Sequence, residues 1–152
     1  MAIILDGGAT TYASTFTASP TTARSITVPD ASFTLAGVDV AQSFTAAQRG
    51  AITALTDGAT ITPDFALANN FSVTLGGNRT MANPTNLTAG QSGSIFIVQD
   101  GTGSRTLAWG SYWDFTTGTA PTLTATASAI DRVDYIVRTT GSIQSVFTGD
   151  YS

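Results

Sequence analysis

The fold of this chain is decided at residues 132–147, which read RVDYIVRTTGSIQSVF. Side chains of an extended strand point alternately to its two faces. The apolar residues at 133, 135 and 137 therefore share one face, and the charged residues at 132, 134 and 138 share the other. Thr140-Gly141 supplies a two-residue turn, and residues 142–147 form a second alternating run. This segment predicts a β-hairpin with one face in a hydrophobic core.

The residues before this hairpin, from Ala51 onward, repeat strand-like runs and turns at intervals of roughly ten residues. Residues 70–75 alternate and are followed by Gly76-Gly77, whereas residues 94–98 are apolar on both faces. The second run is typical of a central strand or of a strand whose outer face meets a partner subunit. Asp57-Gly58 is a strong hairpin-turn signal. We therefore predict an all-β fold for residues 51–152, an antiparallel β-sandwich of the jelly-roll type.

Large aromatic side chains gather in one short stretch of this predicted domain. They are Trp109, Tyr112, Trp113 and Phe115. Trp and Tyr are commonest in cores and subunit interfaces, and their rings also stack on sugar faces. We predict that these four residues form an interface or a glycan-binding platform, and we keep a purely structural core role as the alternative.

Residues 1–50 have scattered, small apolar side chains and differ from the rest. Residues 25–28 and 33–36 alternate on either side of a Pro29-Asp30 turn. A lone two-stranded hairpin is marginal in water, so its apolar face needs a second surface. We predict an extended N-terminal arm that serves attachment and oligomerisation. Its candidate contact residues are Ile26, Val28, Phe33 and Leu35.

The charge pattern restricts the possible partners. All charges come from 6 Arg and 10 Asp, since Lys and Glu are absent, and the formal net charge is -4. Nucleic acids and anionic membranes attract basic surfaces, so neither is an expected partner. The N-terminus lacks the basic and long apolar regions of a secretory signal, and we expect synthesis in a cytoplasm without export by a signal peptide.

The chain offers few groups for catalysis. It contains no His, Cys, Lys or Glu, which leaves Asp as the general acid or base. An Asp pair could cleave sugars, with Asp114, Asp131 and Asp134 as the candidates. Odd spacing places Asp131 and Asp134 on opposite faces of one strand. We predict no enzymatic activity, and no cofactor or metal.

Three phrases of residues 51–152 resemble the C-terminal β modules of bacteriophage tail-fibre and related virion proteins. They are LTDGATITPDF at 55–65, FSVTLGGNRT at 71–80, and TAGQSGSI at 88–95 with GSRTL at 103–107. ITVPDASFTLA at 26–36 and FTAAQRG at 44–50 resemble the linking segments that precede such modules. The resemblance implies a structural virion protein, and the fibres of this family are trimeric.

These observations together predict a homotrimeric tail-fibre, head-fibre or capsid-decoration protein in the virion. The N-terminal arm would attach it to another capsid or tail protein. Unpaired strand edges without Lys or Glu are poorly guarded, which favours coverage by neighbouring copies. The alternative is an adhesion module for host attachment that binds a receptor or a surface glycan.

Overall fold

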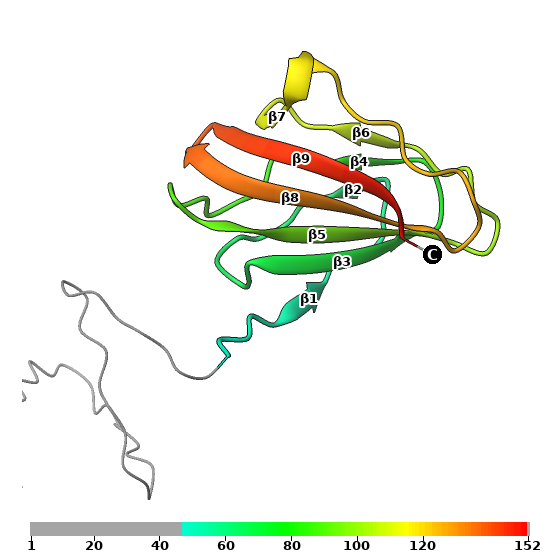
Figure 1. Cartoon of the computed structure of the whole chain (residues 1–152), viewed down its shortest axis with the longest axis horizontal. Coiled ribbons are helices and arrows are strands. Elements are labelled where there is room, and N and C mark those ends of the chain that lie inside the picture. Colours follow the sequence, from blue (N-terminus) through cyan, green and yellow to red (C-terminus); the bar gives the residue numbers. More distant parts are fainter. Residues whose placement is uncertain (1–46, 152) are drawn as a thin grey trace, which may run out of the picture. The chain divides into compact units, whose positions relative to one another are not determined.

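The computed structural model describes residues 47–151 and shows an all-β structure of two sheets (Figure 1). The elements in chain order are β1 (Ile52–Ala54), β2 (Thr60–Ile61), β3 (Asn70–Leu75), β4 (Arg79–Met81), β5 (Ser92–Gln99), β6 (Leu107–Trp109), β7 (Trp113–Phe115), the 3-10 turn η1 (Thr116–Gly118), β8 (Ile130–Thr139) and β9 (Ser142–Tyr151). The predicted arm contacts Ile26, Val28, Phe33 and Leu35 lie outside the described residues. Within the described part, no helix is long and apolar enough to cross a membrane.

The large sheet has the strand order β1-β3-β5-β8-β9-β7, and the small sheet has the order β2-β4-β6. From β1 to β6 the chain alternates between them, so that each strand lies beside the strand two positions earlier. Because each return passes through the other sheet, the pairs β1–β3, β3–β5, β2–β4 and β4–β6 are all parallel. The first six strands therefore form three successive turns of the chain, each with one strand in the large sheet and one in the small sheet. In Figure 1 the small sheet lies behind the large one.

The predicted antiparallel arrangement is correct only for the strand pairs β5–β8 and β8–β9. A jelly roll is built from antiparallel pairs, so that part of the prediction is not confirmed. Asp57-Gly58 does not close a hairpin, because it carries the chain from the large sheet to the small one. The chain bends at Gly58 and Ala59, and this bend joins two sheets instead of two neighbouring strands.

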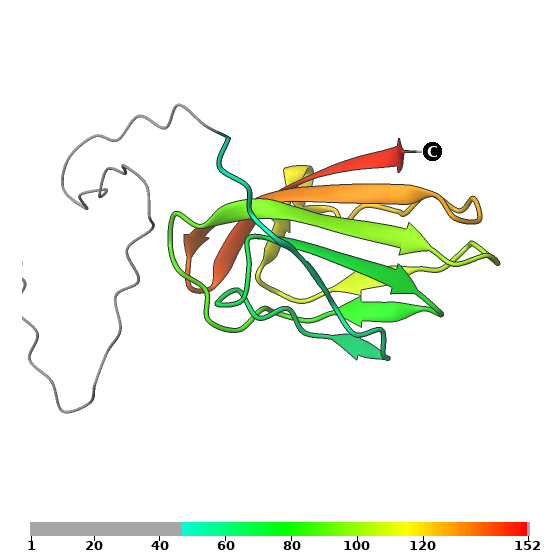
Figure 2. The same ribbon diagram turned by 90° about the horizontal axis from the view of Figure 1, so that it is seen from below.

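The hairpin predicted at residues 132–147 is confirmed as β8 and β9, joined by Thr140 and Gly141. Figure 2 shows these long strands beside β5, splayed by the twist of the sheet. The side chains at 133, 135 and 137 are buried, and those at 132, 134 and 138 point away from the core. The run at 94–98 lies in β5, which has neighbours on both sides and is thus a central strand.

One hydrophobic core is enclosed by both sheets. The large sheet contributes Phe71, Ile95 and Val133 from neighbouring strands, and the small sheet contributes Ile61 and Met81. All five side chains are almost completely inaccessible to solvent. Burial of apolar surface is the main favourable term in folding, so this core holds the two sheets together.

Candidate functional site

The aromatic residues predicted as a platform lie where the last strand of the small sheet approaches β7. Trp113 is buried, and its indole N–H donates a hydrogen bond to the Ala82 carbonyl oxygen at 3.1 Å. Its ring makes edge contacts with Phe65 and Tyr135, each with ring centroids 6.3 Å apart. Trp113 is therefore a core residue whose faces are occupied by other rings.

Trp109 connects this core ring to the half-buried Phe115. The Trp109 ring centroid lies 5.2 Å from that of Trp113 and 4.9 Å from that of Phe115, both in edge-to-face geometry. Tyr112 is also half-buried, and its backbone N–H donates to the Asn83 side-chain oxygen at 2.9 Å. The rings of Trp109, Trp113 and Phe115 seal the junction between the two sheets and pack against one another, which occupies faces that a sugar would need.

A surface groove of about 500 Å³ lies beside this junction, on the outer face of the large sheet. Strands β7, β8 and β9 form it, and we call it the β7–β9 groove. Its lining residues are Asp114, Phe115, Thr116, Asp134, Tyr135, Ile136, Gln144, Ser145 and Val146. Ile136 and Val146 stand in it with 48% and 59% of their surface exposed. Exposed apolar groups that gather in a hollow are typical of a binding surface.

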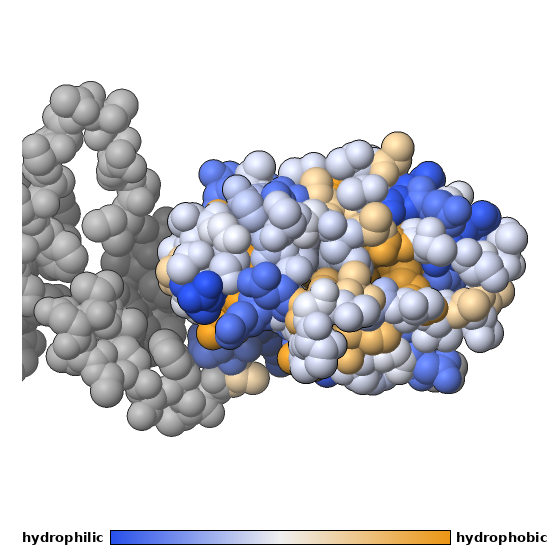
Figure 3. Space-filling model, turned by 90° about the horizontal axis from the view of Figure 1, so that it is seen from above, coloured by the Kyte–Doolittle hydropathy of each residue, from blue (hydrophilic) through white to orange (hydrophobic). Residues whose placement is uncertain are grey.

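The surface around the groove carries little charge. Figure 3 shows the side on which β7 and η1 lie, where most residues have intermediate hydropathy and strongly hydrophilic groups are scattered. Such a surface follows from a sequence in which only 11% of residues are charged. The polar selectivity of the groove must therefore come from a few side chains.

Two carboxylates of the groove have different surroundings. Asp134 accepts hydrogen bonds from Ser94 Oγ at 2.6 Å and Arg132 Nε at 3.0 Å, and it forms a salt bridge with Arg132. Asp114 accepts a hydrogen bond from Ser142 Oγ at 2.6 Å and has no salt bridge within the described part of the chain. Asp114 is thus the less compensated negative charge of the groove.

Asp131, the third acid of the predicted sugar-cleaving set, is not in the groove. It lies on the inner face of β8 and is buried, and its two oxygens accept hydrogen bonds from Thr124 N at 2.8 Å and Asp150 N at 3.0 Å. The opposite-face prediction for Asp131 and Asp134 is therefore correct. Asp131 holds the end of the hairpin against the preceding loop.

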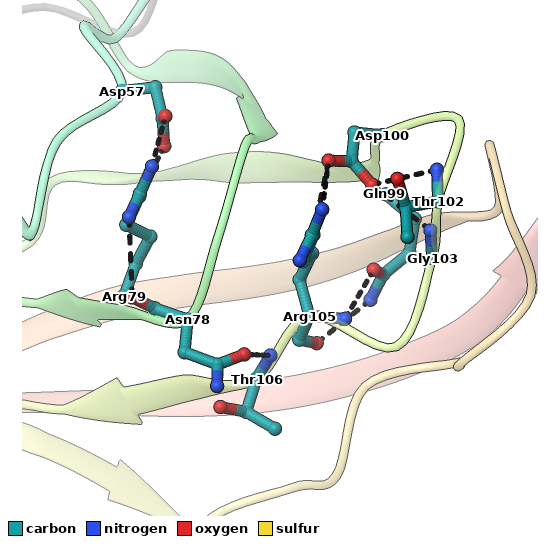
Figure 4. A network of polar contacts seen from close by, with 9 residues as sticks. All are labelled: Asp57, Asn78, Arg79, Gln99, Asp100, Thr102, Gly103, Arg105 and Thr106. Atoms are coloured by element: carbon teal, nitrogen blue, oxygen red, sulfur yellow. Dashed lines mark hydrogen bonds and ion pairs between the residues drawn. The ribbon is translucent and has the colours of Figure 1, made fainter.

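Two further acids, Asp57 and Asp100, belong to a polar network at the end of the sandwich where the chain crosses between the sheets (Figure 4). Asp57 pairs with Arg79 at 2.7 Å, and Asp100 pairs with Arg105 at 2.7 Å. These guanidinium hydrogen bonds lower the pKa of both carboxyls. The Gln99 side chain is buried and bonds both the N–H and the carbonyl oxygen of Arg105. This network holds the segments that connect the two sheets in place through ion pairs and hydrogen bonds.

Tyr135 contributes one further perturbed group beneath the groove. Its hydroxyl donates a hydrogen bond to the Asn69 carbonyl oxygen at 2.8 Å, and burial raises the pKa of Tyr135 to about 12. The phenol is therefore neutral at physiological pH and acts as a structural donor. Among the described residues, no group of three or more His, Cys, Asp or Glu could hold a metal ion.

A known protein family matches a part of the chain that contributes strands to both sheets. A family model described as "Putative phage tail fibre C-terminal domain" matches residues 61–138, from β2 into β8. The chain belongs to this phage tail-fibre family. The matched range contains most of the tail-fibre phrases noted in the sequence. No curated protein and no solved structure matches the chain.

The sequence singled out the aromatic residues of this tail-fibre domain, but it did not predict the groove. The groove forms because β7, which precedes β8 in the chain, pairs with β9 at the sheet edge. Asp114 is thereby placed opposite Gln144, and Asp134 is placed opposite Val146. The apolar residue at 136 was the available signal, since it falls on the face that the charged residues 132, 134 and 138 share.

Proposed function

We propose that this chain is a non-enzymatic structural module of a phage tail fibre that works as a homotrimer and is attached to the particle through residues 1–50. The observation that carries the proposal is the edge of β1, which pairs only with β3 among the described strands, in a domain of the tail-fibre family. Residues 51–55 are uncharged and mostly exposed. Exposed, uncharged strand edges tend to pair with other chains unless they are covered.

The β1 edge has apolar side chains at its surface. Ile52 is 59% exposed, and Leu67, which lines the same surface hollow as Thr53 and Ala54, is 68% exposed. Natural proteins protect such edges with charges, proline or a covering segment. In a trimer, a neighbouring copy covers this edge.

The roles of the acidic residues favour a structural function over catalysis. Asp57 and Asp100 are engaged by arginine, and Asp131 is engaged by backbone N–H groups. Asp114 and Asp134 remain as the acids of the groove. Incubation with host polysaccharide should release no reducing ends. Turnover that Asp114→Asn or Asp134→Asn abolishes would contradict a non-enzymatic role.

The mass of the full chain in solution tests the trimer. Light scattering after size-exclusion chromatography should give three times the chain mass of 15.6 kDa. A stable monomer at micromolar concentration would refute the proposal. Labelling of the C-terminus in intact particles then distinguishes the tail from the head, and label on the head would favour a head-fibre or decoration protein.

A host-attachment role is the second candidate, because the β7–β9 groove combines apolar and hydrogen-bonding groups. Ile136 and Val146 offer apolar contacts to a sugar, while Gln144 and Asp114 can bond its hydroxyls. Trp109 lies against Phe115, so a bound glycan would change tryptophan fluorescence. A fluorescence titration with host surface polysaccharide tests this role, and Gln144→Ala should weaken the response.

A further inference from the structure

The most exposed large apolar side chains of the described part divide into two groups at opposite sides of the large sheet. Ile52 and Leu67 lie at the β1 edge, whereas Ile136 and Val146 lie in the β7–β9 groove. Strand β1 is the first strand of the sheet, and β9 and β7 are the last two. The two surfaces are therefore separate and chemically alike.

The strand register places Ile52 of the first surface and Val146 of the groove on the same face of the sheet. The residues paired in one row across it are Ile52, Asn70, Ser94, Asp134 and Val146. This row starts at the β1 edge and ends in the groove. Four strand spacings separate its ends, which amounts to about 19 Å within one copy.

The two surfaces also carry charges of opposite sign. Arg49 is exposed, lies three residues before Ile52, and has no salt bridge within the described residues. Asp114 is the carboxylate of the groove without an arginine partner. Arg49 and Asp114 therefore carry opposite charges that can pair if the β1 edge of one copy enters the groove of another.

We infer that the β1 edge of one copy docks in the β7–β9 groove of the next copy, head to tail. This inference rests on the proposed trimer and names the surfaces that form it. Two different patches generate a heterologous contact, and such contacts close into a ring when the rotation between copies allows it. Each copy then covers one free edge and fills one groove, so Ile52, Leu67, Ile136 and Val146 all leave water.

Disulfide trapping tests this contact, and the chain has no cysteine to interfere. The variant carrying both Ile52→Cys and Val146→Cys should form a covalent trimer under mild oxidation. A bond within one copy is excluded, since about 19 Å far exceeds the roughly 3.5–4.5 Å between the Cβ atoms of a disulfide. Either single variant should stay uncrosslinked. The matched control combines Val146→Cys with Thr74→Cys, an exposed position of β3 outside both surfaces, and should also stay uncrosslinked.

Charge exchange provides a second measurement. Arg49→Asp or Asp114→Arg alone should weaken trimer assembly about tenfold, because each change opposes two like charges at the contact. The two changes together should restore assembly. Sedimentation velocity over a concentration series measures the effect, and circular dichroism confirms that each variant folds.

The outcomes separate this inference from the proposed function. A trimer in solution without the 52–146 crosslink would overturn the docking and leave the trimer intact. A crosslink from Val146→Cys alone would also overturn it, because it would reveal an interface between identical patches. A monomer would overturn both the docking and the proposed trimer. A covalent trimer from the double variant alone would establish the contact.

Discussion

Gly93 lies at the closest approach between β5 and the residue that precedes β3. A Cβ atom added at Gly93 would lie 1.7 Å from the Asn69 carbonyl oxygen and 2.6 Å from its carbon. Both atoms belong to the backbone, so no side-chain rotation can relieve the clash. The substitution Gly93→Ala must therefore move β5 or the start of β3.

The Asn69 carbonyl oxygen also accepts two hydrogen bonds that this movement would break. Tyr135 Oη donates to it at 2.8 Å and Ser94 N donates at 3.2 Å. Overpacking of a core costs about 1–3 kcal/mol. A buried hydroxyl without a partner costs about 1–3 kcal/mol more. We expect Gly93→Ala to lower the free energy of unfolding by about 2–6 kcal/mol, out of the roughly 5–15 kcal/mol typical of a domain.

Urea denaturation followed by tryptophan fluorescence measures this loss directly, at one fixed protein concentration because assembly contributes to apparent stability. The melting temperature should fall by at least about 8 °C, since 1 kcal/mol corresponds to about 4–8 °C in a domain of this size. Gly101→Ala is the matched control, because a Cβ there meets no atom within 4 Å. It should change the free energy of unfolding by less than about 0.5 kcal/mol. A Gly93→Ala protein as stable as Gly101→Ala would refute the reasoning.

Three further predictions concern single polar groups. Absorbance titration should show one tyrosine that ionises near pH 12, and Tyr135→Phe should remove that step. Since the folded-state pKa of Tyr135 exceeds the usual 10.0, the stability that this group contributes is lost as the pH rises from about 10 to about 12. Asp131→Asn should destabilise the fold by about 1–3 kcal/mol in urea denaturation, because an amide leaves one backbone N–H without its acceptor. Arg105→Gln should raise the pKa of Asp100, measured by carboxyl NMR; the wild-type contribution of this carboxyl is present above pH 4 and is lost as the pH falls further.

The described residues include the predicted aromatic platform but not the predicted arm contacts. The attachment role of Ile26, Val28, Phe33 and Leu35 stays a prediction. The rings of Trp109, Trp113 and Phe115 lie together, and Trp113 is buried among other rings. Contact of these side chains with a partner subunit or a glycan stays a prediction. The fluorescence titration with host surface polysaccharide tests the glycan contact.

Local patterns determined the strand content and the identity of the core-facing residues. Alternation at 70–75 and 132–138 depends only on the two-residue repeat of an extended strand, so it predicts burial wherever the strand is placed. The β8–β9 hairpin was equally predictable, because a two-residue turn places the two strands that it joins side by side and antiparallel.

Strand order and direction were decided only by the tertiary structure. The Asp57-Gly58 turn and the segment 100–106 look like hairpin loops, but packing of both sheets onto one core sends the chain across the sandwich and makes the pairs parallel. Residues 114, 134, 136, 144 and 146 meet in one groove for the same reason, since strand pairing joins segments that sequence separates. A periodic sequence specifies which face of a strand is buried, whereas its neighbours depend on how all the strands share the core.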